Sequence, residues 1–256
     1  MKFIKKFKSV NYDNRKSLNI EYIIIHYTAL EDCNKALGFL CSKEKKVSCH
    51  YLISQNGKIY NLVNERKRAW HAGLSYWKGD TDINSNSLGI ELDYSFNNLN
   101  NKFTLMMMKS LSQLLRYLIN KYKIDIKNIL GHSDIAPFRK QDPGKYFPWD
   151  YLVKKNLAFI PRNKSNSKFL ELNEYFKTNG FKTKKKIAIY ILTKIGYDTM
   201  DVNTNTDKFE TLIKMYQTHY LQSNVSSKID KITFNYLCKH YLNLVLNKNE
   251  KIIIMN

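Results

Sequence analysis

The chain has 256 residues, enough for one large domain or two modest ones, and 43% of them are apolar, which excludes wholesale disorder. Its 42 basic and 22 acidic residues give a formal charge of +20, which favours polyanionic partners. Because the lysines are spread over every segment rather than gathered in one stripe, we expect no dedicated nucleic-acid binding. No apolar run approaches the ~20 residues of a membrane span, and the first residues lack the apolar stretch of a signal peptide.

The first 130 residues combine predicted strands with one long predicted helix. In chain order these are strands at 20–26, 50–63 and 87–93, a helix at 104–122 and a short strand at 128–130. We expect segment 50–63 to form a hairpin, because Asn56-Gly57 is a strong two-residue turn signal. The helix is indicated by apolar residues at helical spacing, namely Met107, Leu111, Leu114, Leu115 and Leu118.

The last third of the chain has a different pattern. FPWDYL at 147–152 is typical of a turn that enters a short helix, and the polar segment 161–168 is typical of a linker. Beyond it, helices are predicted at about 168–179, 184–196, 207–221 and 230–246, with no convincing strand. We therefore expect an α/β fold in which a mixed central β-sheet is flanked by helices, followed by a small all-α C-terminal domain. The expected boundaries are 1–160, a linker at 161–168, a helical domain at 169–247 and a tail at 248–256.

Two histidines and an aspartate could form a metal site. His26 ends one predicted strand and His132 directly follows another, and ligands of α/β sheets gather at the carboxyl ends of strands. Asp142 comes after a proline-containing loop that can fold back. Two histidines and a carboxylate are a common catalytic zinc set. From spacing alone, a core histidine and a turn aspartate remain as alternatives, because the sequence has no HExxH-type signature.

Other residues are chemically able but ambiguous. Glu91 lies inside a predicted strand, where it is either a buried general base or an edge-strand carboxylate that faces solvent. Lys140 could stabilise an oxyanion, although most lysines in so basic a chain are surface cations. Trp70 and His71 stand in a glycine-containing loop that suits the rim of a sugar or peptide groove, with core packing as the alternative for Trp70.

Five stretches taken together resemble the zinc-dependent N-acetylmuramoyl-L-alanine amidases, the type-2 amidases whose fold is shared with peptidoglycan recognition proteins. They are YIIIHYTA (22–29), VSCHYLISQNGKIYNLV (47–63), AWHAG (69–73), NSNSLGIEL (84–92) and GHSDIAPFRKQDPGKYFPW (131–149). They occur in the order of that family and cover nearly all of residues 10–152. The C-terminal helices resemble, more weakly, a peptidoglycan-binding module of some bacterial members, which favours the cell-envelope branch.

The resemblance implies a role for each matching residue. The residues that match the zinc ligands are His26, His132 and Asp142, which would hold one Zn²⁺ per chain. Glu91 matches the catalytic glutamate, and Lys140 matches the lysine beside the zinc. The residues that match the substrate groove are Trp70, His71 and Asn84.

The implied reaction is hydrolysis of the amide bond between N-acetylmuramic acid, or its anhydro form, and L-alanine of the stem peptide, in cell-wall turnover or remodelling. No expected catalytic residue is missing, which disfavours the non-catalytic recognition branch. A non-catalytic peptidoglycan-binding protein is kept as the alternative. The implied partners are peptidoglycan and muropeptides, and we expect a monomer in the periplasm or cell envelope, with the cytoplasm as the alternative. Three of the four cysteines lie close together in sequence, but no disulfide can be deduced from them.

Overall fold

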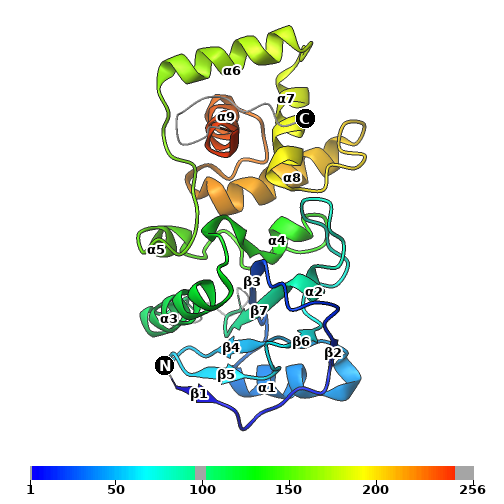
Figure 1. Cartoon of the computed structure of the whole chain (residues 1–256), viewed down its shortest axis with the longest axis vertical. Helices are drawn as coiled ribbons and strands as arrows, with labels where there is room; N and C mark the ends of the chain where they lie inside the picture. Colours follow the sequence, from blue (N-terminus) through cyan, green and yellow to red (C-terminus); the bar gives the residue numbers. More distant parts are fainter. Residues whose placement is uncertain (1, 96–101, 246–256) are drawn as a thin grey trace. The chain divides into compact units, whose positions relative to one another are not determined.

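The computed structural model describes residues 2–95 and 102–245. The chain divides into two compact units. Unit 1 comprises Met1–Ser75, Thr81–Ala136 and Lys140–Phe159, and unit 2 comprises Tyr76–Asp80, Pro137–Arg139 and Ile160–Asn256. The fold class expected from the sequence is confirmed, because a mixed sheet flanked by helices is followed by an all-helical region (Figure 1).

Unit 1 is built on a six-stranded sheet in the order β1-β5-β4-β7-β3-β8. Its strands are β1 (Phe3–Ile4), β3 (Tyr22–Tyr27), β4 (Tyr51–Ile53), β5 (Ile59–Asn61), β7 (Ser87–Leu92) and β8 (Ile129–Gly131). Only the β4–β5 pair within this sheet is antiparallel, and it is the hairpin predicted at Asn56-Gly57. A separate antiparallel pair joins β2 (Tyr12–Asn14) to β6 (Lys67–Ala69).

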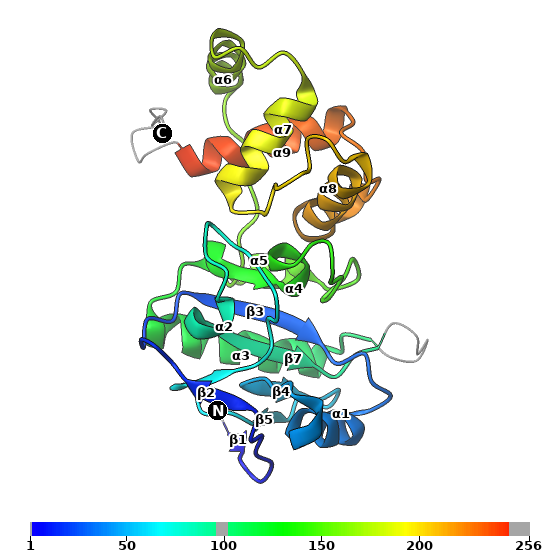
Figure 2. The ribbon, with the colours of Figure 1, turned by 90° about the vertical axis from the view of Figure 1, so that its right-hand side faces the viewer.

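Helices cover both faces of this sheet. The long α3 (Leu105–Tyr122) packs on one face, and all five apolar residues that predicted it are completely buried. The α1 helix (Cys33–Cys41) packs on the opposite face, in a cluster that includes Leu52 of β4. Figure 2 shows β3 and β7 side by side in the sheet. The other helices of unit 1 are α2 (Ile83–Asn86), α4 (His132–Ile135) and α5 (Trp149–Val153).

The alternation of side chains along the strands assigns the site to one face of the sheet. Ile23 and Ile25 of β3 contribute to the core that includes α3, so His26 points to the other face. Glu91 is the register partner of both His26 and Leu52, and Leu52 packs with α1. His26 and Glu91 therefore lie on the face of the sheet away from α3.

Unit 2 contains the four predicted C-terminal helices. They are α6 (Asn166–Thr178), α7 (Lys184–Ile195), α8 (Thr206–Tyr220) and α9 (Lys231–Val245). The α6 helix begins at Asn166, inside the range expected as a linker, and the expected tail at 248–256 lies outside the described residues. A segment from earlier in the chain also belongs to this unit: the Trp77 ring packs edge-on against Tyr197, and the Lys78 N–H donates to the Gly196 carbonyl.

Two further observations concern the whole described chain. No helix within residues 2–95 and 102–245 has the length and apolar character needed to cross a membrane. The cysteines are free thiols, and Cys49 and Cys238 are buried.

Candidate metal centre

Three neighbouring strands bring the candidate residues together. His26 is in β3, and its register partner in β7 is Glu91. On the other side of β3, Ile25 pairs with Gly131 at the end of β8, and His132 follows as the first residue of α4. Because these strands are parallel, their carboxyl ends meet at one edge of the sheet. The two histidines predicted from the sequence are therefore adjacent in space.

The loop after α4 returns to deliver Asp142. The Ser133 N–H donates to the Asp142 carbonyl at 2.9 Å, and the Gly131 N–H donates to Asp134 Oδ2 at 2.7 Å. The approach of the loop requires glycine at 131, because a Cβ there would lie 2.6 Å from Pro143 Cδ. A backbone hydrogen bond thus ties α4 to the returning loop, and the Asp134 side chain holds the end of β8.

The three candidate ligand atoms converge. His26 Nδ1 lies 3.0 Å from His132 Nδ1 and 3.1 Å from Asp142 Oδ2, and His132 Nδ1 lies 3.0 Å from the same oxygen. All three residues are buried. Tetrahedral zinc at its usual bond lengths separates such ligand atoms by about 3.3 Å. The donor set and its spacing fit a zinc ion, and among the described residues this is the group identified as able to hold a metal.

Electrostatics favours the ligating forms of these side chains. Burial, together with the neighbouring His132, lowers the pKa of His26 to about 4, so its imidazole is neutral at physiological pH. Burial alone would raise the pKa of Asp142, but His132 and His26 hold that pKa well below its usual range. A neutral imidazole and an ionised carboxylate are the forms that bind a metal.

Glu91 is a buried carboxylate with an unpartnered oxygen. The residue as a whole is partly exposed, but its Oε2 is buried and has no hydrogen-bond partner within the described part of the chain. Burial, reinforced by the nearby charge of Asp142, raises the pKa of Glu91 to about 8, while Lys140 acts in the opposite direction. The alternative of a solvent-facing edge residue is wrong, because β7 lies between β4 and β3 in the middle of the sheet.

Lys140 lies close enough to influence the site electrostatically. Its positive charge is one of the influences that act to lower the pKa of Glu91 and of His26, although burial raises the pKa of Glu91 overall. The residue is partly buried, and within residues 2–95 and 102–245 its ammonium makes no hydrogen bond or ion pair. Its role in catalysis stays a prediction.

The residues expected to bind substrate occupy different positions. Trp70 is partly exposed and donates from Nε1 to Asp13 Oδ2 at 2.7 Å. His71 and Asn84 are buried, with 9% and 7% of their surface exposed. His71 Nδ1 lies 3.0 Å from His26 Nε2, and Asn84 Oδ1 accepts from the His71 N–H. Their role in binding substrate stays a prediction. Their observed contacts connect them to His26 of the metal site, His71 directly and Asn84 through His71.

Some participants were not predicted from the sequence. His132 Nε2 lies 3.1 Å from the Ala72 carbonyl, and Ser87 Oγ lies 3.2 Å from His71 Nε2. A backbone carbonyl leaves no signal in a sequence, and a serine at a strand start is unremarkable. Tyr27 was also missed: burial, followed by the charge of Asp142, raises the pKa of its hydroxyl to about 12. Its position directly after His26 was the available signal.

Comparison with known proteins gives consistent results. The sequence profile of the N-acetylmuramoyl-L-alanine amidase family matches residues 16–145. The chain is 32% identical to the N-acetylmuramoyl-L-alanine amidase AmiD of Escherichia coli, over 84% of this chain and 79% of that protein. It is 33% identical to the 1,6-anhydro-N-acetylmuramyl-L-alanine amidase AmpD of Haemophilus influenzae, over 57% of this chain and 88% of that protein.

Solved structures show the same similarity at the level of the fold. AmiD from E. coli, solved in complex with the substrate anhydro-N-acetylmuramic acid-L-Ala-D-gamma-Glu-L-Lys, superposes with a TM-score of 0.72 at 28% identity, covering 88% of this chain and 89% of that chain. AMPDH3 from Pseudomonas aeruginosa, in complex with anhydromuramic pentapeptide, also gives a TM-score of 0.72, at 26% identity, covering 86% of this chain and 90% of that chain.

Proposed function

Because the chain belongs to the N-acetylmuramoyl-L-alanine amidase family, we propose that it hydrolyses the amide bond between N-acetylmuramic acid, or its anhydro form, and L-alanine of the peptidoglycan stem peptide. The observation that carries the proposal is the convergence of His26 Nδ1, His132 Nδ1 and Asp142 Oδ2 within 3.1 Å of one another. The anhydromuramic peptides bound by the similar AmiD and AMPDH3 support the substrate class.

One zinc ion per chain is proposed as the cofactor. Held by His26, His132 and Asp142, it would supply a Lewis acid that lowers the pKa of a water molecule and polarises the scissile carbonyl. Its positive charge would also oppose the effect of burial on Glu91 and favour the carboxylate form of that residue.

The protein side chains then move the proton and stabilise the charge. Glu91 Oε2 takes a proton from the attacking water, whose oxygen forms the new bond to the carbonyl carbon. The Lys140 ammonium stabilises the negative charge that develops on the carbonyl oxygen. When the C–N bond breaks, Glu91 returns the proton to the departing nitrogen, which becomes the free amino group of L-alanine. Trp70, which is partly exposed, remains the proposed substrate-side residue, whereas the buried His71 lies 3.0 Å from His26 Nε2 and the buried Asn84 accepts from the His71 N–H.

A hydrolysis assay tests the proposal. Purified protein supplied with zinc is incubated with muropeptides, and mass spectrometry follows stem peptides that carry a free L-alanine amino terminus. We expect release by the wild-type chain, and loss of release in His26→Ala, in Asp142→Ala and after chelation, with recovery when zinc is added back to the chelated wild type. Full activity after complete metal removal would refute the zinc mechanism. A folded, zinc-loaded chain without activity would favour the peptidoglycan-binding alternative.

The compartment and the helical region are part of the same proposal. The similarity to AmiD extends over 84% of this chain, and so over much of unit 2. We propose a cell-envelope enzyme whose residues 169–247 form a peptidoglycan-binding-like domain, as the resemblance of the C-terminal helices implies. We propose intact peptidoglycan as a substrate besides soluble muropeptides. An envelope enzyme should cut intact sacculi as well as anhydro-muropeptides, whereas a cytosolic recycling enzyme should cut only the soluble fragments.

A further inference from the structure

We propose that the dipeptide His71-Ala72, held by Asn84, orients both histidine ligands of the metal site, so that His71 and Asn84 are positioning residues. The inference rests on the proposed zinc site, because it concerns how the ligands of that site are oriented. Outer partners of ligating histidines fix the tautomer and the ring orientation of the ligand.

The first contact fixes the tautomer of His132. Its Nε2 lies 3.1 Å from the carbonyl oxygen of Ala72. A carbonyl oxygen can only accept a hydrogen bond, so the imidazole proton must lie on Nε2. The lone pair of Nδ1 is then left to face His26 and Asp142.

The second contact fixes His26 through a chain of hydrogen bonds with one consistent direction. Ser87 Oγ donates to the Ile83 carbonyl, so that oxygen is free to accept from His71 Nε2, which lies 3.2 Å away. With its proton on Nε2, His71 accepts through Nδ1 from His26 Nε2 at 3.0 Å. His26 Nδ1 is thereby unprotonated, like that of His132. Three acceptor atoms then converge, which is an arrangement that needs a cation.

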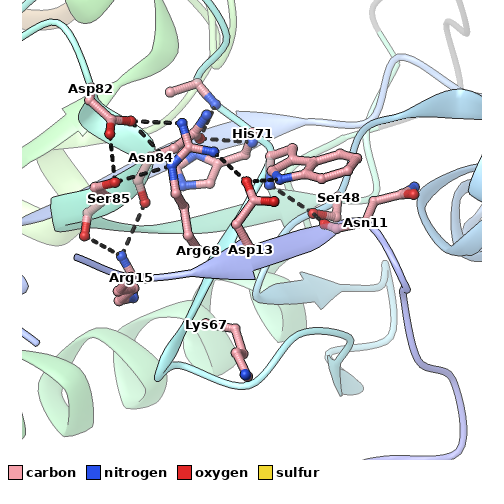
Figure 3. A network of polar contacts seen from close by, with 12 residues as sticks. Asn11, Asp13, Arg15, Ser48, Lys67, Arg68, His71, Asp82, Asn84 and Ser85 are labelled. Carbon is pink, nitrogen blue, oxygen red and sulfur yellow. Dashed lines mark hydrogen bonds and ion pairs between the residues drawn. The ribbon is translucent and has the colours of Figure 1, made fainter. Parts of the chain in front are cut away.

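A single side-chain atom holds the dipeptide that makes both contacts. Asn84 Oδ1 accepts from the His71 N–H at 3.0 Å and from the Ala72 N–H at 2.8 Å. Arg15 in turn donates to the carbonyl oxygens of Asn84 and Ser85 (Figure 3). The orientation of the two ligands therefore depends on a buried network anchored outside the metal site.

The His71 ring lies against β7 at a position where the strand has a glycine, Gly89. A Cβ on Gly89 of β7 would lie 2.4 Å from Cγ of the His71 ring. Glycine in the LGIEL segment is thus explained by the position of His71, which the proposal assigns to the metal site rather than to the substrate groove.

Paired variants of His71 provide the test. His71→Phe keeps a planar ring but removes the acceptor for His26 Nε2, whereas His71→Gln retains a side-chain oxygen that can accept. Zinc affinity is measured by competition with a chromophoric chelator, and the absorption spectrum of the cobalt-substituted chain reports ligand geometry. We expect His71→Phe to bind zinc about 10- to 100-fold more weakly and to show an altered cobalt spectrum, with both restored toward wild type in His71→Gln.

Several controls make the result decisive. Thermal unfolding of the metal-free variants shows whether each chain is folded, and Ser87→Ala serves as a milder second variant with an expected several-fold loss of zinc affinity. Unchanged zinc affinity in the folded variants, with a raised KM for muropeptide, would overturn the positioning role and favour substrate binding by His71. If the wild type binds no zinc, the proposed function fails; if it binds zinc and the variants match it, only this inference fails.

Discussion

At the scale of single residues, Glu91 has the environment that general-base chemistry requires. Its Oε2 is buried and has no hydrogen-bond partner among the described residues. The negative charge of Asp142 acts to raise the pKa of Glu91, and the positive charge of Lys140 acts to lower it. Glu91→Gln removes the proton acceptor but keeps the shape of the side chain. We expect turnover of muropeptide to fall by about 10²- to 10⁴-fold while the zinc content stays at the wild-type level. Measurement of kcat and metal content on the same preparation checks this, and loss of zinc as severe as in His26→Ala would identify Glu91 as a ligand instead.

The raised pKa of Glu91 also predicts that the stability of the folded chain depends on pH. The pKa of Glu91 is raised to about 8 in the folded metal-free chain, whereas a glutamate in the unfolded chain has its ordinary pKa of 4.5. Between these values the folded state holds the extra proton, so this contribution to stability is complete below pH 4.5 and is lost as the pH rises through 8. Each unit of pKa shift corresponds to about 1.4 kcal/mol.

Denaturant unfolding in the presence of chelator measures this effect. The free energy of unfolding of the wild type, taken relative to Glu91→Gln, should decrease between pH 5 and pH 8. The comparison between the two chains cancels the titration of groups that they share. Parallel pH profiles for wild type and variant would mean that Glu91 titrates normally in the folded chain.

The limits of sequence-based prediction are also clear at this scale. His26, His132 and Asp142 could be named in advance because their side chains recur in a recognisable pattern. The Ala72 carbonyl could not be named, since any residue supplies one, and only the folded chain brings it within 3.1 Å of His132.

At the scale of elements, the β4–β5 hairpin depends on a glycine. Gly57 has φ +77°, and a Cβ there would lie 2.8 Å from Ser110 Oγ and 2.9 Å from the Met106 carbonyl of α3. Gly57→Ala should therefore lower the free energy of unfolding by about 1–3 kcal/mol, because both the backbone conformation and the space oppose a side chain. Chemical denaturation of the metal-loaded chain measures the change.

A second glycine supplies the matched control. Gly38 lies within α1, and nothing is within 4 Å of the position that its Cβ would take. Gly38→Ala should raise stability by about 0.4–1 kcal/mol, because alanine favours the helix and restricts the unfolded chain. A loss of stability equal in the two variants would show that the hairpin imposes no special demand at Gly57.

Elements differed in how well local pattern predicted them. The α3 helix was predicted closely because eighteen residues repeat one apolar face. The strands β1, β2 and β6 were not predicted, since segments of two or three residues carry too little periodicity and form only by pairing with distant partners. The residues of β7 also do not indicate whether the strand lies at the centre or at an edge of the sheet. The exposure of Glu91 could therefore not be decided from the sequence.

At the scale of the whole molecule, the formal charge of +20 concerns the approach to substrate rather than the chemistry. One surface hollow of unit 1 illustrates the charge: it is lined along α3 and after α5 by Lys109, Arg116 and Lys155, with no acidic residue among its lining residues. Peptidoglycan is an anionic polymer that presents many carboxylates at once, whereas a soluble muropeptide presents few. A basic surface should therefore matter more for the polymer.

The salt dependence of hydrolysis tests this difference. Raising the ionic strength from about 0.05 M to 0.5 M shortens the distance over which exposed charges act to well below 10 Å. The rate on intact sacculi should fall several-fold over that range, while kcat on a soluble muropeptide stays nearly constant. Replacing Lys109, Arg116 and Lys155 by glutamine should flatten the salt response on sacculi without changing kcat on the muropeptide, because the residues lie outside the metal site. Attraction between the basic surface and the polymer should affect only the rate on sacculi. An equal salt response on both substrates would therefore mean that salt acts on the metal site and not on this attraction.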